Sequence, residues 1–384
     1  MMKSPKIRFK GFDGDWEQRK LSDVVDVRSG RDYKHLEEGD IPVYGTGGYM
    51  LSVSEALSDD EDAIGIGRKG TIDNPYILRA PFWTVDTLFY AVPREKHDLN
   101  FVYGIFQNIN WKAKDESTGV PSLSKATINA VSTMTPDYEE QRLIGEYFSN
   151  LDHLITLHQK KFEQLTILKK YMLQKMFPQN GSDKPEIRFD GFTDDWEQRK
   201  FGETVIIERG GSPRPIDAFI TDDENGLNWV KIGDAPEQGN YITKTAEKIR
   251  PEGLKKTREV HPGDLILSNS MSFGRPYIMA IDGCIHDGWL LIRDEEKRYD
   301  LKFLCQMLGT EQMLAQYRAM AAGSTVNNLN KELVGNTEVK VPSIAEQAKI
   351  GEYFSKVDDL ITLHQQKCDE LRNAKKFMLQ NMFI

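Results

Sequence analysis

Two stretches of the chain place apolar residues at alternating spacings of four and three, which predicts helices that pair through one stripe of their surface. They cover 138–177 and 343–384. The seam positions of the first are Ile144, Phe148, Leu151, Ile155, His158, Phe162, Leu165, Lys169, Met172 and Met176. Those of the second are Ile350, Phe354, Val357, Ile361, His364, Cys368, Leu371, Lys375, Met378 and Met382. A helix of about 40 residues is roughly 60 Å long and cannot bury this stripe alone. We therefore expect an antiparallel pair in which the numbers of facing residues sum to 526.

Each repeated helix begins with the residues of a capping box. Asp137 and Ser343 are in the N-cap position, and Glu140 and Glu346 follow three residues later. In such a box the cap side chain and the glutamate each accept a backbone N–H of the first turn. The spacing predicts this reciprocal arrangement at both helix starts.

The helices belong to a longer internal repeat. An arm at 5–20 returns at 185–200, and 24 of 40 positions are identical between 138–177 and 344–383. The blocks between arm and helix differ in sequence, and the second is 26 residues longer. A shared frame that carries two different modules fits this pattern. It divides the chain into an arm with a first recognition domain (1–137), a helix (138–177), a linker with a second arm (178–200), a second recognition domain (201–342) and a second helix (343–384).

Both variable blocks alternate extended and helical patterns. The extended runs are Ala63–Gly67, Pro81–Val92, Asp264–Ser268 and Tyr277–Ile281. One amphipathic helix is expected in each block, near 98–110 and 300–321, and each opens with an aspartate cap. The predicted fold class is mixed α/β: two globular domains joined by two long helices that form an antiparallel coiled coil, with a pseudo-two-fold internal repeat.

Composition narrows the class of protein. The formal net charge is −9, so the surface as a whole is not a basic coat for nucleic acid. The three cysteines are far apart, which disfavours a disulfide framework and favours the cytoplasm. No apolar run reaches the roughly 20 residues of a membrane helix, so no membrane partner is expected.

Motifs of catalysis are weak or missing in the sequence. Gly65–Gly70 matches GxGxxG, but the turn residues that follow favour a glycine hairpin that presents Arg68 and Lys69. The tetrapeptide Asp73-Asn74-Pro75-Tyr76 resembles the motif of amino-methyltransferases without its second proline. No HExxH, GxSxG or Walker lysine loop occurs. We expect no catalytic residue and no metal site in this chain.

Loops rich in Gly, Ser, Asn, Tyr and Arg are the candidate binding elements. Glycines allow backbone N–H groups to approach phosphate, and Arg and Asn can hydrogen-bond guanine and adenine edges. The candidate DNA-binding residues of the first block are Tyr44, Thr46, Tyr49, Arg68, Lys69, Ser117, Thr118 and Ser122. Those of the second block are Arg209, Ser212, Arg214, Asn269, Ser270, Arg275, Ser324, Asn327 and Asn328. The alternative interpretation of any one loop is ordinary turn chemistry.

Two further observations bear on these loops. Thr118–Lys125 aligns with Ser324–Lys331, so both blocks place a polar loop before the same lysine. The blocks are nevertheless acidic overall, with 11 basic and 18 acidic residues at 21–137 and 17 and 21 at 201–342. Affinity for DNA must therefore come from clustered residues or from a partner that adds phosphate contacts.

The repeated EQRLIGEYFSNLDHLITLHQKK helix, together with IPVYGTGGY and IGRKGTIDNPYI, resembles the specificity (S) subunit of type I restriction-modification systems. The resemblance implies a non-catalytic DNA specificity subunit whose two target recognition domains each read half of a split double-stranded DNA site. It also implies an antiparallel helical spacer, two modification (M) methyltransferase subunits docked on it, and two restriction (R) translocase-nuclease subunits. Cofactors are implied only for the partners, namely S-adenosylmethionine, ATP and Mg²⁺.

Two alternatives from other classes remain at this point. One is a coiled-coil scaffold whose two domains bind ligands other than DNA. The other is a degenerate DNA adenine methyltransferase, which would use the Asp73–Tyr76 segment.

Overall fold

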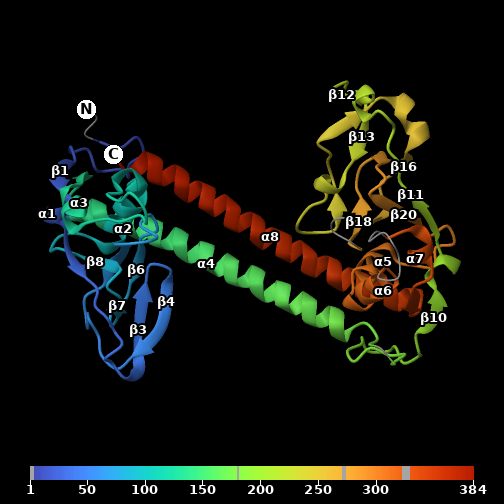
Figure 1. The fold of residues 1–384 in the computed structure, drawn as a ribbon, viewed down its shortest axis with the longest axis horizontal. Coiled ribbons are helices and arrows are strands. Elements are labelled where there is room, and N and C mark those ends of the chain that lie inside the picture. Colours follow the sequence, from blue (N-terminus) through green and yellow to red (C-terminus); the bar gives the residue numbers. More distant parts are fainter. Residues whose placement is uncertain (1–3, 180, 270–273, 322–328) are drawn as a thin grey trace. The chain divides into compact units, whose positions relative to one another are not determined.

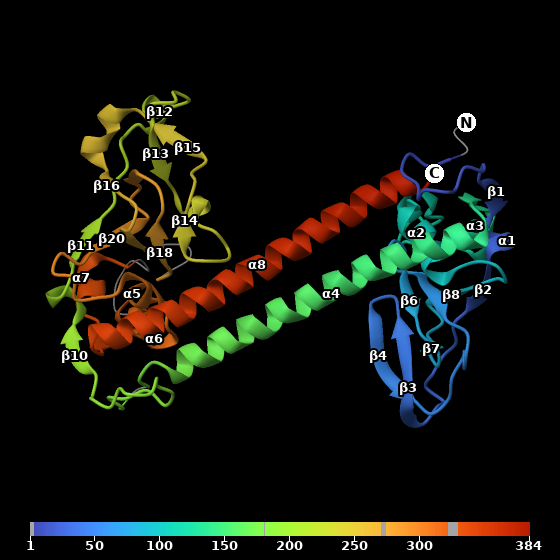
Figure 2. The ribbon, with the colours of Figure 1, turned by 180° about the vertical axis from the view of Figure 1, so that it is seen from behind.

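The computed structural model describes residues 4–179, 181–269, 274–321 and 329–384. The chain divides into two compact units, and each contains parts of both long helices. Unit 1 consists of Met1–His158 with Lys367–Ile384, and unit 2 consists of Gln159–Gln366. The long helices α4 (Tyr138–Lys175) and α8 (Ile344–Met382) cover the two stretches that the heptad pattern predicted as helical (Figures 1 and 2).

Unit 1 contains a mixed α/β domain. Its other elements are β1 (Glu17–Lys20), α1 (Leu21–Val24), β2 (Val25–Ser29), β3 (Glu38–Gly45), β4 (Gly48–Val53), β5 (Ala63–Gly67), β6 (Tyr76–Leu78), β7 (Trp83–Thr84), β8 (Leu88–Pro93), α2 (Leu99–Asn108), the 3₁₀ helix η1 (Trp111–Lys114), α3 (Lys125–Ala130) and β9 (Ser132–Thr135). The strands form sheets of order β2-β8-β5-β6, β4-β3-β7 and β1-β9.

Unit 2 contains a second mixed α/β domain. Its strands are β10 (Glu197–Lys200), β11 (Ile206–Arg209), β12 (Ile220–Thr221), β13 (Leu227–Val230), β14 (Tyr241–Ile242), β15 (Glu247–Ile249), β16 (Arg258–Val260), β17 (Leu265–Ser268), β18 (Pro276–Met279), β19 (Gly283–Ile285), β20 (Trp289–Arg293) and β21 (Glu338–Val341). Its α-helices are α5 (Leu301–Leu308), α6 (Glu311–Ala321) and α7 (Lys331–Gly335). Its 3₁₀ helices are η2 (Phe201–Glu203), η3 (Ile216–Ala218), η4 (Ile232–Asp234) and η5 (Pro251–Lys256).

The two divergent blocks share one sheet topology. The order β11-β20-β17-β18 in unit 2 matches β2-β8-β5-β6 in unit 1, and β10-β21 matches β1-β9. A parallel pair also recurs, β3 with β7 in unit 1 and β13 with β19 in unit 2, and unit 2 has a second parallel pair, β14 with β18. The order β15-β13-β19 matches β4-β3-β7, and unit 2 adds the short strands β12, β14 and β16, in keeping with its longer block. The repeat in the sequence therefore extends to the parts where the sequences differ.

One predicted helix is wrong. The run 300–321 forms two helices, α5 and α6, separated by Gly309 and Thr310. The N–H of Gly309 bonds to the end of α5, and the Thr310 carbonyl and hydroxyl accept N–H groups of the first turn of α6. Glycine after a helix end and threonine before a helix start are the residues that such a break requires.

The predicted capping boxes are only half present. The backbone N–H of Glu140 bonds to Asp137 Oδ1 at 2.9 Å, and that of Glu346 bonds to Ser343. The glutamate side chains, however, are buried and bind the arms. In unit 1, Arg8 Nε and Nη2 donate to the two Glu140 carboxylate oxygens at 2.6 and 2.7 Å.

Unit 2 repeats this bidentate pair. Arg188 Nε and Nη2 donate to the carboxylate oxygens of Glu346 at 2.7 and 2.8 Å. These bonds raise the arginine pKa in both arms, and the fork-to-carboxylate geometry explains why the arm and the helix start recur together. The arginine fixes the arm to the helix, and this long-range role replaces the local capping role of the glutamate.

Each glutamate is followed in its long helix by a glutamine and a glycine. These two residues contact the start of α2 in unit 1 and the start of α5 in unit 2. The Gln141 amide oxygen accepts the N–H of Asp98, the cap of α2, at 3.2 Å. A Cβ on Gly145 would lie 2.0 Å from Asp98 Oδ1, and one on Gly351 would lie 2.4 Å from Asp300 Oδ1. Glycine is therefore the residue that allows α2 and α5 to start against the long helices.

The end of each long helix completes a domain core. In unit 1 the Phe383 ring stacks on Phe101 with centroids 5.3 Å apart and lies 5.7 Å from Phe148. In unit 2 the Phe177 ring stacks in the same way on Phe303 at 5.5 Å. Unit 1 is thus completed by the end of α8, and unit 2 is completed by the end of α4.

Within each unit the long helices run antiparallel. In unit 1, Lys375 near the end of α8 bonds Asp152 in the first half of α4, at 2.6 Å. In unit 2, Lys169 near the end of α4 lies 2.6 Å from Asp358 in the first half of α8. Both contacts agree with the predicted register to within one residue. The seam of unit 2 includes a buried cluster of Leu165, Val357 and Ile361.

The register predicts a specific disulfide. Cysteines introduced at Ile155 and Leu371, in a Cys368→Ser background, should crosslink under mild oxidation because the predicted register, which the Lys375–Asp152 contact supports, places them opposite each other. Non-reducing electrophoresis of the full chain measures the crosslink. The pair Leu151→Cys and Leu371→Cys, one layer away, is the control and should stay reduced; preferential crosslinking of this control would contradict the register.

Candidate nucleic-acid interface

The loop after β5 is the centre of the candidate site in unit 1. The N–H of Arg68 donates to Thr87 O, in the turn between β7 and β8, at 2.8 Å. The N–H of Leu123 donates to Arg68 O at 2.9 Å, which fixes the loop 115–122 beside it. Three loops that are far apart in the sequence are therefore joined by backbone hydrogen bonds.

These loops surround an open cavity of about 820 Å³. It brings together five candidate residues: Arg68, Lys69, Ser117, Thr118 and Ser122. Lys125 and Glu116 also line it, so three cationic side chains lie beside one carboxylate. The cavity is thus locally basic within an acidic block, as binding to phosphate requires.

The remaining candidates of unit 1 lie at the turn between β3 and β4. Thr46 and Tyr49 line a second cavity of about 680 Å³ together with Asp86. The Tyr49 side chain is 63% exposed, and the half-buried Tyr44 ring packs edge-on against it at 6.3 Å. Tyr49 can therefore reach a ligand, whereas Tyr44 supports it.

In unit 2 four candidates gather around Asp287, in the turn between β19 and β20. Arg209 Nε and Asn269 Nδ2 donate to the Asp287 carbonyl at 3.3 and 2.8 Å. Ser212 Oγ donates to the Asp287 carboxylate at 2.9 Å, and Arg214 Nη2 lies 3.9 Å from it. Arg214 is strongly exposed, whereas Asn269 is buried and holds the turn instead of presenting its amide to solvent.

Arg275 lies apart from this cluster. Its Nη2 donates to Glu237 O at 2.7 Å, and its guanidinium lies 5.0 Å from the Tyr277 ring centre. The other candidates of the second block lie outside the described residues: Ser270, Ser324, Asn327 and Asn328.

Sequence reasoning missed the two aspartates at the centre of these loops. No local sequence motif marks Asp86 or Asp287. Their place in the candidate site is recognised only in the tertiary structure, where the ends of strands from elsewhere in the chain meet at their turns. Lys125 could have been found, because it aligns with Lys331 in the repeat.

The two weak enzyme motifs lie in one hairpin. Gly65–Gly70 runs from the end of β5 into a loop, and β5 pairs with β6 in an antiparallel hairpin. The predicted glycine hairpin with exposed Arg68 and Lys69 is therefore confirmed. Asp73–Tyr76 leads into β6 of the same hairpin, with Asp73 paired to Lys112 at 2.7 Å, which does not match a cofactor loop at a parallel strand end.

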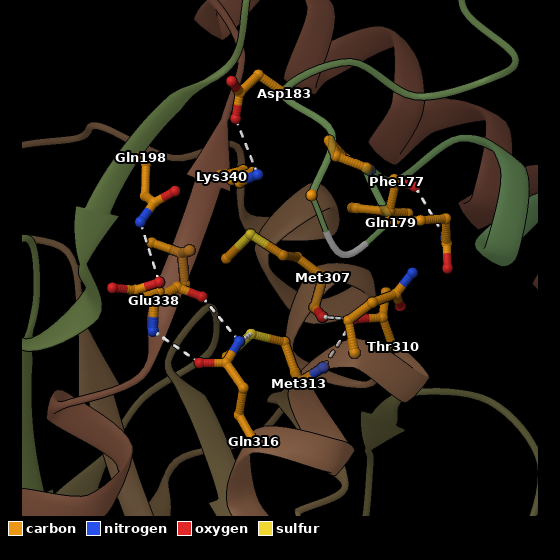
Figure 3. Close-up of a pocket in the computed structure, with 14 residues that line it drawn as sticks. Phe177, Gln179, Asp183, Gln198, Met307, Thr310, Met313, Gln316, Glu338 and Lys340 are labelled. Atoms are coloured by element: carbon orange, nitrogen blue, oxygen red, sulfur yellow. Dashed lines mark hydrogen bonds and ion pairs between the residues drawn. The ribbon is translucent and has the colours of Figure 1, made fainter.

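A separate cavity of about 550 Å³ lies in unit 2 beside α6 and β21 (Figure 3). Its polar side chains bind one another: Gln198 donates to Glu338, and Lys340 pairs with Asp183. Gln316 bonds both the N–H and the carbonyl of Glu338 at 2.9 Å. Because its polar groups pair with each other, we assign this cavity a structural role as a joint between the second arm and α6.

Among the described residues no group of three or more metal-ligating side chains comes together. No helix in the described ranges combines the length and the apolar character needed to cross a bilayer.

The chain has two domains of one topology, and each presents polar and basic loops beside the repeated helices. This arrangement defines the chain as a modular recognition protein. The family model for the type I restriction modification DNA specificity domain matches twice, at 13–166 and 193–373. The chain belongs to this family, and it carries two DNA specificity domains.

Individual relatives agree with this assignment. The chain is 25% identical over 284 residues to the type I restriction enzyme MjaVIII specificity subunit of Methanocaldococcus jannaschii, which covers 69% of this chain and 64% of that protein. It is 21% identical over 406 residues to the putative MjaX specificity subunit of the same organism, covering 94% and 91%. The crystal structure of a type I restriction-modification S subunit from M. genitalium has the same fold, with a TM-score of 0.73, 14% identity and 99% coverage of both chains.

Proposed function

We propose that the chain is the specificity subunit of a type I restriction-modification complex, and that each unit reads one half of an asymmetric, two-part site in double-stranded DNA. The observation that carries the proposal is the convergence of polar and cationic loops at equivalent places in two domains of equal topology. Since the loops differ between the units, the two half-sites differ in sequence.

The loop chemistry suits major-groove recognition. Exposed Arg68, Lys69 and Arg214 offer donors to phosphate oxygens and guanine, and Tyr49 offers an exposed aromatic face with a hydroxyl. Because the blocks are acidic overall, binding by the chain alone should be weak. Partner subunits would supply the remaining phosphate contacts.

The long helices are the proposed docking surface for the modification subunits. Leu154 and Leu157 of α4 are 42% and 48% exposed, and the repeat places Leu360 and Leu363 of α8 at 43% and 46%. These leucines are retained in both copies although they are not buried within the chain. Repeated exposed apolar positions fit two copies of one partner, which supports two modification subunits.

The chemistry of the complex is assigned to other chains. We propose that this chain is non-catalytic, that S-adenosylmethionine is bound by the modification subunits, and that ATP and Mg²⁺ are used by two restriction subunits. The complex would act on DNA in the cytoplasm. A coiled-coil scaffold for other ligands and a degenerate methyltransferase are the competing functions, and the family match to DNA specificity domains disfavours both.

A charge-removal experiment tests the DNA-binding surface. Alanine at Arg68, Lys69, Arg214 and Arg275 together should weaken binding of duplex DNA by the chain assembled with its modification subunits. The reason is that each lost phosphate contact reduces the salt slope by about 1, and each lost base contact costs about 1–3 kcal/mol at one position. An electrophoretic shift across salt concentrations measures both effects.

The matched control removes four exposed cations elsewhere: Arg19, Lys112, Lys184 and Lys356. This variant should bind as the unaltered complex does. Undiminished binding by the first variant, or an equal loss in both, would refute the assigned surface. If the unaltered complex does not bind DNA at all, the scaffold function is favoured instead.

A further inference from the structure

The same tight turn occurs in both variable blocks, and its two sequences have a single residue in common. It covers 85–88 in unit 1, between β7 and β8, and 286–289 in unit 2, between β19 and β20. In each turn the N–H of the fourth residue bonds to the carbonyl of the first, at 2.9 and 3.1 Å. The second residue is an aspartate in both turns, Asp86 and Asp287.

A glycine directly after β2 in unit 1, or after β11 in unit 2, contacts each turn. Gly30 and Gly210 donate their N–H groups to the carbonyl of the fourth turn residue at 3.0 and 2.9 Å. A Cβ at Gly30 or Gly210 would lie 2.0 or 2.1 Å from the carbonyl oxygen of the first turn residue. No side chain fits in either place, so both domains build the turn in the same way.

The residue at the end of the central strand holds each turn from the other side. The N–H groups of Arg68 and Asn269 donate to the carbonyl of the third turn residue at 2.8 and 2.9 Å. Their side chains donate to the carbonyl oxygens of Asp86 and Asp287, at 3.4 and 2.8 Å. The backbone of each aspartate is therefore fixed, and its carboxylate is not used for this purpose.

The carboxylate of Asp287 is positioned by a serine hydroxyl and has a more distant arginine as its ion-pair partner. Ser212 Oγ donates to it at 2.9 Å, while the Arg214 guanidinium is 3.9 Å away and the aspartate side chain is 42% exposed. His286 Nδ1 lies 3.7 Å from the carboxylate, but this nitrogen accepts the N–H of Gly288 at 2.6 Å and so has no proton to share. Burial lowers the pKa of His286, which agrees with a neutral ring.

A fixed, exposed carboxylate among cations that we propose to face DNA can take part in base recognition. It repels phosphate oxygens, but it can accept a hydrogen bond from an exocyclic amino group in the major groove, as aspartate does from cytosine N4. Asp86 is exposed in the corresponding place, beside Thr46 and Tyr49. We propose that Asp86 and Asp287 are specificity-determining residues, each accepting a hydrogen bond from the amino group of a cytosine or adenine in its own half-site. This inference rests on the proposed function.

Selection from a random duplex library tests the proposal. The full chain, assembled with its modification subunits, is used unaltered and as Asp86→Ala and Asp287→Ala. Each variant should lose about 5- to 150-fold discrimination at one base pair, the worth of one good base contact. The loss should fall in one half of the site for Asp86→Ala and in the other half for Asp287→Ala. The base whose preference disappears shows whether cytosine or adenine supplies the amino group.

Asp287→Asn is a second, conservative variant. It keeps an oxygen that accepts from Ser212 but replaces the other acceptor by a donor, so the preferred base pair should change while binding is retained. Non-specific duplex should bind the alanine variants at least as tightly as the unaltered complex, because a repulsive charge has been removed. Asp60→Ala and Asp282→Ala, exposed carboxylates at the opposite ends of β5 and β19, are the matched controls and should leave the selected site unchanged.

Other results would overturn the inference. Tighter binding of all sequences with an unchanged selected site would make the aspartates simple repulsive charges. Equal weakening on every sequence, together with a lower melting temperature, would give them a structural role only. If the unaltered complex selects no sequence, the proposed function itself fails, which is distinct from a selected site that the variants leave intact.

Discussion

Replacing Arg8 with alanine should lower the free energy of unfolding by about 3–5 kcal/mol, because it leaves the fully buried Glu140 carboxylate without its partner. Arg188→Ala should do the same through Glu346 in unit 2. Urea unfolding followed by tryptophan fluorescence measures both, since Trp16 and Trp196 belong to the two arms and are buried in the two cores.

The matched control is Arg19→Ala. Its pair with Glu17 is exposed on both sides, so the expected loss is at most about 1 kcal/mol. The double variant Arg8→Leu with Glu140→Leu should be more stable than Arg8→Ala, because no charge is left buried. A loss in Arg8→Ala no greater than that in Arg19→Ala would contradict the anchoring role.

A fragment of residues 1–180 should form a two-fold dimer. In the full chain the core of unit 1 is completed by Met382 and Phe383, which the fragment lacks. Its own helix is followed directly by Met176 and Phe177, the residues that complete the equivalent core in unit 2. Antiparallel self-pairing about residue 160 would place these residues in the open core of a second copy.

Sedimentation measures the dimer, and sequencing of methylated DNA measures its specificity. With modification subunits added, the dimer should direct methylation of an interrupted palindrome built from the first half-site alone, because both domains are then identical. Phe177→Ala should abolish the dimer, since burial of a phenylalanine contributes about 3–5 kcal/mol, whereas Ile167→Ala at a 69% exposed position should not. A monomeric fragment, or one that still needs the second half-site, would show that the halves are not equivalent modules.

The divergent blocks show how a specificity subunit can change what it reads without changing its frame. The contacts of Glu140, Gln141 and Gly145 with the arm and α2 recur in unit 2, and so does the turn that carries Asp86. Loops such as 115–122 lie outside these contacts. Substitution there would alter the surface that we propose to face DNA and would leave the core in place.

The sequence by itself determined the long helices, their antiparallel register and the duplication. The reason is that the heptad spacing of apolar residues and the internal repeat can both be read directly along the chain. It also placed Ala63–Gly67 as a strand and exposed Arg68 and Lys69 after it. The break at Gly309 was readable from its cap residues but was hidden by a continuous amphipathic pattern.

Only the tertiary structure decided what the buried charges and the turn aspartates do. Glu140 reads locally as a capping residue, yet its partner Arg8 lies 132 positions away in the sequence. Asp86 and Asp287 read as ordinary turn residues until two strand ends fix their backbones from outside the turn. The periodicity of apolar side chains encodes which face of a helix or strand is buried. A contact between elements that are distant in the sequence depends instead on how the sheets and helices pack around the core, and no local sequence pattern encodes this packing.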